Sequence, residues 1–302
     1  MATLRQFSYF LAVAEEGSFS RAAARMHVAQ PSLSQQVRAL EAELGTPLFD
    51  RLPRVVRLTP AGRAVLPHAE LTVRSAARAR GAAQAAVGVE AGELEISTIR
   101  SLAAGLLPDL IRRWRVKHPE TTIHLKEASH RSTAEEWVRE GICEIGIGPR
   151  PKRWSGPIKS LGWEEFVVVL PENDPPLGRA QITLGELADR RWVLFDPDHG
   201  LSEVVARACA LADPPFVPSA AVFTSQVDAA AELAAAGVGP AVVPATSVPD
   251  ALGSAAVPIR PRLGRELTVY GRAEWSGLAA RFTELLDEMS WPKAPRRSID
   301  VG

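Results

Sequence analysis

Polar side chains near the N-terminus carry groups of the kind that can hydrogen-bond to DNA bases. Leu33, Val37, Leu40 and Leu44 recur at helical spacing and define one apolar helix face. At 100° per residue, the opposite face presents Pro31, Ser34, Gln35 and Arg38. Hydroxyl, amide and guanidinium groups hydrogen-bond base edges and phosphates in a major groove. The pattern favours a recognition helix, although the solvated face of an ordinary amphipathic helix has the same composition.

The flanking segments fit a helix-turn-helix with a wing. A first helix ends at Gly17, Ser18 or Ser20 can cap a second helix, and a tight connection over residues 27–30 leads into the third. After Gly45, two extended arms around Pro53 carry arginines that are spaced to grip the flanking phosphate backbone. The candidate DNA-binding residues are Gln30, Pro31, Ser32, Ser34, Gln35, Arg38, Arg51, Arg54 and Arg57.

The rest of the chain predicts one long helix and then an α/β region. Residues 59–91 form the linker after a DNA-binding domain at 1–58, and most of the linker reads as helix, with Pro67 as an irregularity. From Gly92, apolar strand segments alternate with helical segments, which predicts α/β units with largely parallel sheets. A stretch rich in Pro, Gly and Arg divides this region, 92–302, into subdomain I (about 92–149 and 265–291) and subdomain II (about 150–264). The tail from Trp291 onward is expected to be flexible.

A run of about 60 residues resembles a known DNA-binding domain. It includes GSFS-x-AA, V-x-QPSLS, LE-x-x-LG, LF-x-R and LT-x-AG, in this order and without a gap. This run is similar to the winged helix-turn-helix of LysR-type transcriptional regulators. The resemblance implies a sequence-specific regulator of transcription that binds a double-stranded DNA operator, with the long helix as a dimerising linker in a homodimer or homotetramer. It also implies two periplasmic-binding-protein-like subdomains with an effector cleft between them.

The α/β region indicates where a small-molecule effector would bind. Ligands of open α/β sheets lie beyond the carboxyl ends of strands, where loops and helix N-termini converge. Helix N-termini and hydroxyls favour an anion, and Arg100 with Arg131 could clamp a carboxylate. A small organic anion is therefore the expected effector, although each residue taken singly could be a helix cap or a solvated charge. The candidate effector-binding residues are Thr98, Ile99, Arg100, Ser101, Leu102, Ser129, His130, Phe195, His199 and Ser225.

Composition and missing motifs limit the alternatives. The 302 residues hold 46% hydrophobic and 23% charged residues, and 35 basic residues balance 35 acidic ones, which excludes a uniformly cationic surface. Two cysteines cannot form a disulfide framework, the six histidines lack ligand spacing, and neither a membrane span nor a signal segment is visible. We therefore expect a cytoplasmic protein without a metal or cofactor. A solute-binding protein and an enzyme remain the competing classes, and no G-x-S-x-G, H-E-x-x-H, P-loop or G-x-G-x-x-G motif supports catalysis.

Overall fold

The computed structural model describes residues 1–51, 56–86 and 92–302. It consists of two compact units, residues 1–89 and residues 90–302, and each is considered by itself. Within the described residues, no helix is both long enough and apolar enough to cross a lipid bilayer.

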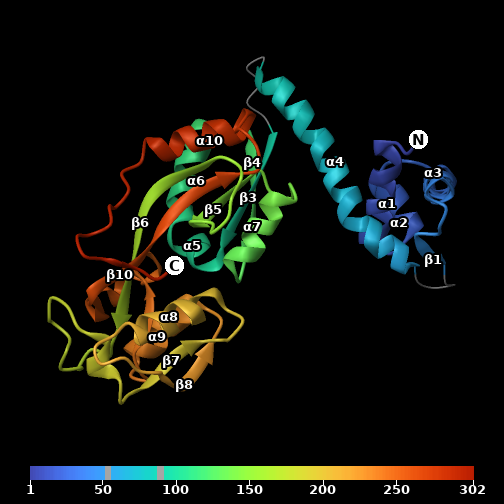
Figure 1. The fold of residues 1–302 in the computed structure, drawn as a ribbon. Coiled ribbons are helices and arrows are strands. Elements are labelled where there is room, and N and C mark those ends of the chain that lie inside the picture. Colours follow the sequence, from blue (N-terminus) through green and yellow to red (C-terminus); the bar gives the residue numbers. More distant parts are fainter. Residues whose placement is uncertain (52–55, 87–91) are drawn as a thin grey trace. The chain divides into compact units, whose positions relative to one another are not determined.

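The first unit begins with three short helices around an apolar core. They are α1 (Leu4–Glu16), α2 (Phe19–Arg25) and α3 (Gln30–Leu44) (Figure 1). Gly17 ends α1 in the left-handed conformation, which glycine adopts without steric cost, and the Ser18 hydroxyl then caps α2. Leu33, Val37 and Leu40 of α3 are fully buried in the core of this unit, as the helical periodicity predicts, whereas Leu44 at the end of the helix is exposed.

A small antiparallel sheet and a long helix complete the first unit. Strands β1 (Phe49–Arg51) and β2 (Val56–Leu58) pair with Asp50 opposite Arg57. The Glu41 carboxylate of α3 accepts hydrogen bonds from the Leu48 and Phe49 amides at 2.9 and 3.3 Å. These two bonds attach the start of the wing to the recognition helix. Helix α4 (Pro60–Ala86) follows, with Pro67 inside it.

The start of α4 is fixed by a side chain and by a close backbone approach. The Thr59 hydroxyl accepts a hydrogen bond from the Gly62 amide at 3.0 Å and donates one to the Pro47 carbonyl at 2.8 Å. A Cβ atom at Gly62 would lie only 2.1 Å from the Leu48 carbonyl oxygen. The LT-x-AG sequence therefore provides both the cap and the one side chain small enough for this contact.

The second unit has two lobes that share a seven-stranded sheet with the order β4-β3-β5-β10-β6-β9, in which β11 also pairs with β10. Lobe I is built on the parallel strands β3 (Gly92–Ile99), β4 (Thr121–Ala128) and β5 (Ile145–Pro149). Its helices are α5 (Arg100–Gly105), α6 (Leu107–Lys117), α7 (Arg131–Arg139) and α10 (Gly277–Asp287).

Lobe II contains a separate pair of parallel strands, β7 (Arg191–Phe195) and β8 (Ser219–Thr224). Its other elements are α8 (Gly200–Ala210), α9 (Val227–Ala235), β9 (Ala241–Pro244) and the 3-10 helices η1 (Leu184–Leu187), η2 (Ala245–Ser247) and η3 (Asp250–Ala255). The lobe has its own apolar core, which includes Trp192 and Phe195.

Two long antiparallel strands join the lobes. Strand β6 (Ile158–Val169) leads from lobe I to lobe II and β10 (Ala256–Gly271) returns beside it (Figure 1). Because β10 runs back, it pairs antiparallel with both β5 and β6, and the sheet is mixed where the sequence predicted largely parallel strands. Strands β6 and β10 therefore cross between the lobes in opposite directions.

The C-terminal tail is ordered, so the expectation of a flexible tail is wrong. Strand β11 (Ile299–Asp300) pairs in parallel with β10, and Val301 is buried in the lobe II core. The apolar Ile299 and Val301 flank the exposed Asp300 in an alternating pattern. That pattern is too short to stand out beside the Pro and Arg residues that precede it.

Gly62 provides a test of the close approach at the start of α4. We expect Gly62→Ala to destabilise the first unit by about 1–3 kcal/mol, because the new methyl group overlaps a backbone oxygen that cannot rotate away. Amide hydrogen exchange over residues 4–44 measures this loss. Gly81→Ala is the matched control in the same helix: nothing lies within 4 Å of its Cβ position, so we expect it to be neutral or stabilising by up to about 1 kcal/mol. Equal effects of the two variants would contradict the packing argument.

Candidate functional site

The N-terminal half of α3 presents a polar, exposed surface. Gln30, Pro31, Ser32 and Gln35 are exposed, and no side chain caps the helix at Ala29. Arg38 is also exposed, and its Nε donates to the Ser34 carbonyl at 3.3 Å. Uncapped amides at a helix N-terminus, amide side chains and a guanidinium together suit contact with phosphates and base edges.

Other predicted DNA contacts have different environments. Ser34 is only 6% exposed, because α3 packs against both α1 and α2, whereas the sequence placed it on the outer face. Arg57 is exposed on β2. Arg51 lies in β1, but its side chain is outside the described residues, as is the whole of Arg54. The described part of this surface therefore consists of the start of α3 together with Arg57.

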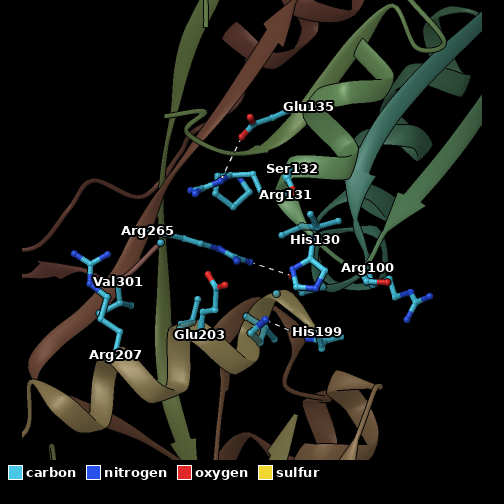
Figure 2. Close-up of a pocket in the computed structure, with 18 of the residues that line it drawn as sticks. Arg100, His130, Arg131, Ser132, Glu135, His199, Glu203, Arg207, Arg265 and Val301 are labelled. Carbon is cyan, nitrogen blue, oxygen red and sulfur yellow. Dashed lines mark hydrogen bonds and ion pairs between the residues drawn. The ribbon is translucent and has the colours of Figure 1, made fainter. Parts of the chain in front are cut away.

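A pocket of about 380 Å³ lies between the two lobes of the second unit. Lobe I contributes the end of β3, the start of α5, the loop after β4 and the first two turns of α7, while lobe II contributes His199 and one face of α8 as far as Arg207. The Gly200 amide donates to the Ser129 carbonyl at 3.0 Å, so the lobes touch directly beside the pocket. Strand β10 and the C-terminal tail complete the lining through Arg265 and Val301 (Figure 2).

The pocket lining is predominantly basic. Its cations are Arg100, Arg131, Lys152, Arg207 and Arg265 and its carboxylates are Glu135 and Glu203. Arg131 pairs with Glu135 at 3.3 Å. Within the described part of the chain, Arg100, Lys152 and Arg207 form no ion pair and are exposed. These three cations outnumber Glu203, the remaining carboxylate of the lining, so the cavity has a positive potential that attracts anions.

Burial also affects the acid within this cationic group. Burial raises the pKa of Glu135 above its ordinary value, and the charges of Arg131, Arg139 and Lys152 oppose that effect. The penalty for burying the charged carboxylate therefore outweighs the attraction of these three cations.

A buried ion pair lies at the base of the pocket. Arg265 on β10 donates through Nε and Nη2 to the Glu164 carboxylate on β6, at 2.6 and 2.5 Å, and both side chains are almost fully buried. The same Nη2 donates to the Ser101 hydroxyl of α5 at 3.0 Å. The Thr246 hydroxyl of η2 donates to the other Glu164 oxygen at 2.8 Å. One pair thus connects both crossing strands with both lobes.

His199 at the start of α8 is held as a neutral side chain. Its Nδ1 accepts the Leu201 amide hydrogen at 3.2 Å, which places the proton of the neutral ring on Nε2. Burial lowers the pKa of His199, and the guanidinium of Arg100 lowers it further, whereas the carboxylates of Asp196 and Asp198 oppose this change. The ring stacks on Phe195 with 4.9 Å between centroids, and Nε2 is buried without a hydrogen-bond partner among the described residues. A ligand acceptor that reached this nitrogen would satisfy it.

Matches to family models cover both units. The model of the bacterial regulatory helix-turn-helix protein of the lysR family matches residues 4–63, and that of the LysR substrate binding domain matches residues 87–290. The chain belongs to the LysR family of transcriptional regulators. It is therefore a DNA-binding regulator of transcription with an effector-binding domain.

Individual proteins agree with this assignment. The transcriptional regulator ShiR of Corynebacterium glutamicum is 36% identical over 79% of this chain and 81% of its own length. The regulator AlsR of Bacillus subtilis is 35% identical, and that match covers only 62% of each chain. The crystal structure of full-length CbnR with its target DNA superposes with a TM-score of 0.68 and 27% identity, over 95% of this chain and 99% of that one.

The pocket of this LysR regulator brings together part of the predicted effector site. Its lining includes the predicted Ile99, Arg100, Ser101, Ser129, His130 and His199. Four predicted residues lie outside the lining. The Thr98 hydroxyl donates to the Ile147 carbonyl within the sheet, Leu102 is buried in the lobe I core, Phe195 lies beneath His199, and Ser225 is exposed after β8.

Several lining residues of this regulator had no place in the predicted site. Lys152 comes from the basic stretch that the sequence marked only as a boundary, and Arg207 lies one turn beyond Glu203 on α8. Arg265 and Val301 lie near the C-terminus, far along the chain from the other lining residues. A helical projection of α8 could have predicted Arg207, because it lies on the same helix face as Gly200 and Glu203. No pattern in the neighbouring sequence indicates that Val301 lines the pocket.

The cysteines and acidic residues do not form a second site in the described regions. Cys143 and Cys209 are both buried, and burial raises the pKa of Cys209 to about 12, so its thiol is not ionised at neutral pH. No group of three or more His, Cys, Asp or Glu side chains suitable for a metal gathers in the described ranges.

The buried pair of this LysR regulator yields a stability prediction. Arg265→Ala leaves the Glu164 carboxylate buried without its cation, and we expect a loss of about 3–5 kcal/mol. All seven tryptophans lie in residues 114–291, so their fluorescence during urea unfolding reports on this unit. Arg150→Ala is the control, because it removes an exposed arginine from a 3.2 Å pair with Glu266, the next residue on β10, and should cost less than about 1 kcal/mol. A comparable loss of unfolding free energy in both variants would contradict the claim that burial makes the Arg265 pair more important for stability than an exposed pair.

Proposed function

We propose that this LysR regulator binds its operator through α3 and the wing, and that a small organic anion in the interlobe pocket controls its activity. The observation that carries the effector half is the excess of positive charge around the pocket. We further propose that the protein acts in the cytoplasm and needs no metal or cofactor.

On the DNA, the proposed roles differ between helix and wing. Gln35 and Arg38 follow the uncapped N-terminus of α3 and carry side chains that suit base edges. Arg57 on β2 suits a phosphate of the flanking backbone. The other proposed contacts are Gln30, Pro31 and Ser32, with Arg51 and Arg54 on the wing. Ser34 is proposed to support the helix by packing, since it is buried.

The proposed symmetry of the operator and the proposed oligomeric state both follow from the presence of one recognition helix in each chain. A homodimer or homotetramer, paired through the 27-residue helix α4, would present its recognition helices in symmetric pairs. The corresponding half-sites would lie roughly 34 Å apart, or a multiple of that distance. We propose the regulatory domain as the source of any further assembly beyond the dimer.

The proposed effector carries at least one carboxylate or a comparable anionic group. Arg100 and Lys152 supply charge from lobe I and from the loop after it, and Arg207 supplies charge from lobe II. Ser129 and His130 add polar groups beside α7, and His199 offers an unused Nε2 hydrogen. Leu201 and Val204 add apolar surface for an organic body. A ligand that contacts both lobes shifts the protein toward the interlobe arrangement that it binds more tightly. The size of this shift cannot exceed the difference between its binding free energies for the two arrangements.

Variants on α3 and on the wing should separate base reading from phosphate contact. Gln35→Ala or Arg38→Ala should weaken operator binding by about 1–3 kcal/mol per half-site and leave binding to random DNA nearly unchanged. Arg57→Ala should weaken binding to every sequence and lower the salt slope by about one unit. Fluorescence anisotropy with the promoter fragment of the protein's own gene measures both effects. Arg113→Ala, an exposed arginine in the other unit, is the control and should change neither. Equal losses on operator and random DNA for Gln35→Ala and Arg38→Ala would contradict their base-reading role.

Carboxylate probes should test the ligand class. We expect benzoate to bind and its neutral amide, benzamide, to bind at least about tenfold more weakly, because only the acid gains from the pocket cations. Arg100→Ala and Arg207→Ala should each weaken benzoate binding about tenfold in calorimetric titration, whereas Arg113→Ala should have no effect. If benzamide binds as tightly as benzoate, or if both pocket variants bind benzoate normally, the anionic class is wrong.

A further inference from the structure

The C-terminal tail is attached to the crossing strands at two places. The Trp163 amide of β6 donates to the Pro292 carbonyl at 2.8 Å. Further along, β11 pairs with β10 through Leu263 opposite Ile299, and the Val301 amide donates to the Gly264 carbonyl at 2.9 Å. These backbone bonds hold the last residues in a defined register rather than leaving them in solvent.

The end of the tail lies against the pocket. Val301 is 2% exposed, belongs to the lobe II core and lines the pocket, and Gly302 lines it as well. A Cβ atom at Gly302 would lie 2.6 Å from the Cβ of Arg265, so the tail packs directly on that residue. In Figure 2, Val301 and Arg207 are on one side of the view and Arg100 is on the other.

Val301 also extends the apolar part of the lining. Leu201 and Val204 of α8 belong to the same apolar core as Val301 and line the same pocket. The charged groups would hold an anionic end of a ligand, and an organic body would contact these three side chains. A branched, rotamer-restricted residue at this position gives the cavity a firm boundary.

We propose that residues 299–302 form a wall of the effector pocket and that Val301 limits the size of the ligand's apolar body. This inference rests on the proposed role of the pocket as the effector site. The tail is thereby a specificity element: its register on β10 places Val301, and Val301 determines how large an acid the pocket accepts.

A size comparison tests the role of Val301. The probes are benzoate and 2-naphthoate, titrated calorimetrically into the full chain. Val301→Ala should raise the affinity ratio of naphthoate to benzoate about tenfold and Val301→Phe should lower it, since space for a few carbon atoms changes binding by about 10- to 200-fold. Ile299→Ala is the matched control on the same strand, because Ile299 packs on the lobe II core but does not line the pocket, and its ratio should equal that of wild type. An unchanged ratio in both Val301 variants overturns the proposal.

A thiol probe tests the wall without any assumption about the effector. Val301→Cys should react faster with an anionic methanethiosulfonate (2-sulfonatoethyl) than with a cationic one (2-trimethylammonioethyl). Each rate is divided by that of 2-mercaptoethanol, and we expect a preference of about tenfold from the surrounding cations. Lys293→Cys, at an exposed position in the same tail, should show a much smaller preference. The native thiols are buried and, unlike Val301, do not line the pocket, and wild-type protein gives their background.

The two experiments separate the two proposals. If neither acid binds to wild type but the Val301→Cys variant keeps its preference for the anionic reagent, the ligand class fails and the wall stands. If the acids bind but the Val301→Cys variant reacts like the Lys293→Cys variant, the tail is not a wall and the proposed function stands. If neither acid binds and the Val301→Cys variant shows no preference for the anionic reagent, both proposals are overturned.

Discussion

The buried pair between Arg265 and Glu164 is the interaction on which the regulatory unit depends. It joins the two strands that cross between the lobes, and its remaining hydrogen bonds reach Ser101 in lobe I and Thr246 in lobe II. An ion pair without solvent is favourable only when nearly every polar atom is satisfied. One carboxylate and one guanidinium therefore couple the arrangement of the lobes to the base of the pocket and to the place where the tail packs on Arg265.

The features that the sequence predicts well have causes within a few residues. Gly17 and Ser18 end one helix and begin the next, and Thr59 with Gly62 starts α4. Each of these caps and turns accepts only a few residue types, and these stand at a fixed spacing from one another. The sequence pattern therefore predicts where each helix begins and ends. In the α/β region, alternating strands and helices predict the lobes in the same way. The antiparallel crossing is harder to predict, because strand direction depends on the path of the whole chain.

The pocket is only partly predictable because its lining comes from distant segments. The rule that ligands lie at strand ends identifies Ile99, Arg100 and His130, whose positions follow from β3 and β4. The same rule includes Thr98, although its hydroxyl is engaged by a carbonyl inside the sheet. Val301 reaches the pocket because its strand pairs with residues 36 positions earlier in the chain, and the local periodicity of the sequence does not reveal such a pairing.

Strand β10 has a mechanical consequence for the regulatory unit. Its pairing with β6 is irregular between Pro258 and Leu263 and again between Leu267 and Thr268, whereas the stretch between these points is regular and carries Arg265. The tail adds a third strand beside this stretch. Because β10 pairs with β5 without interruption across the second of these points, a change in the angle between the lobes would be accommodated at the first, between Pro258 and Leu263. Ligand binding would then turn lobe II as a unit about this point.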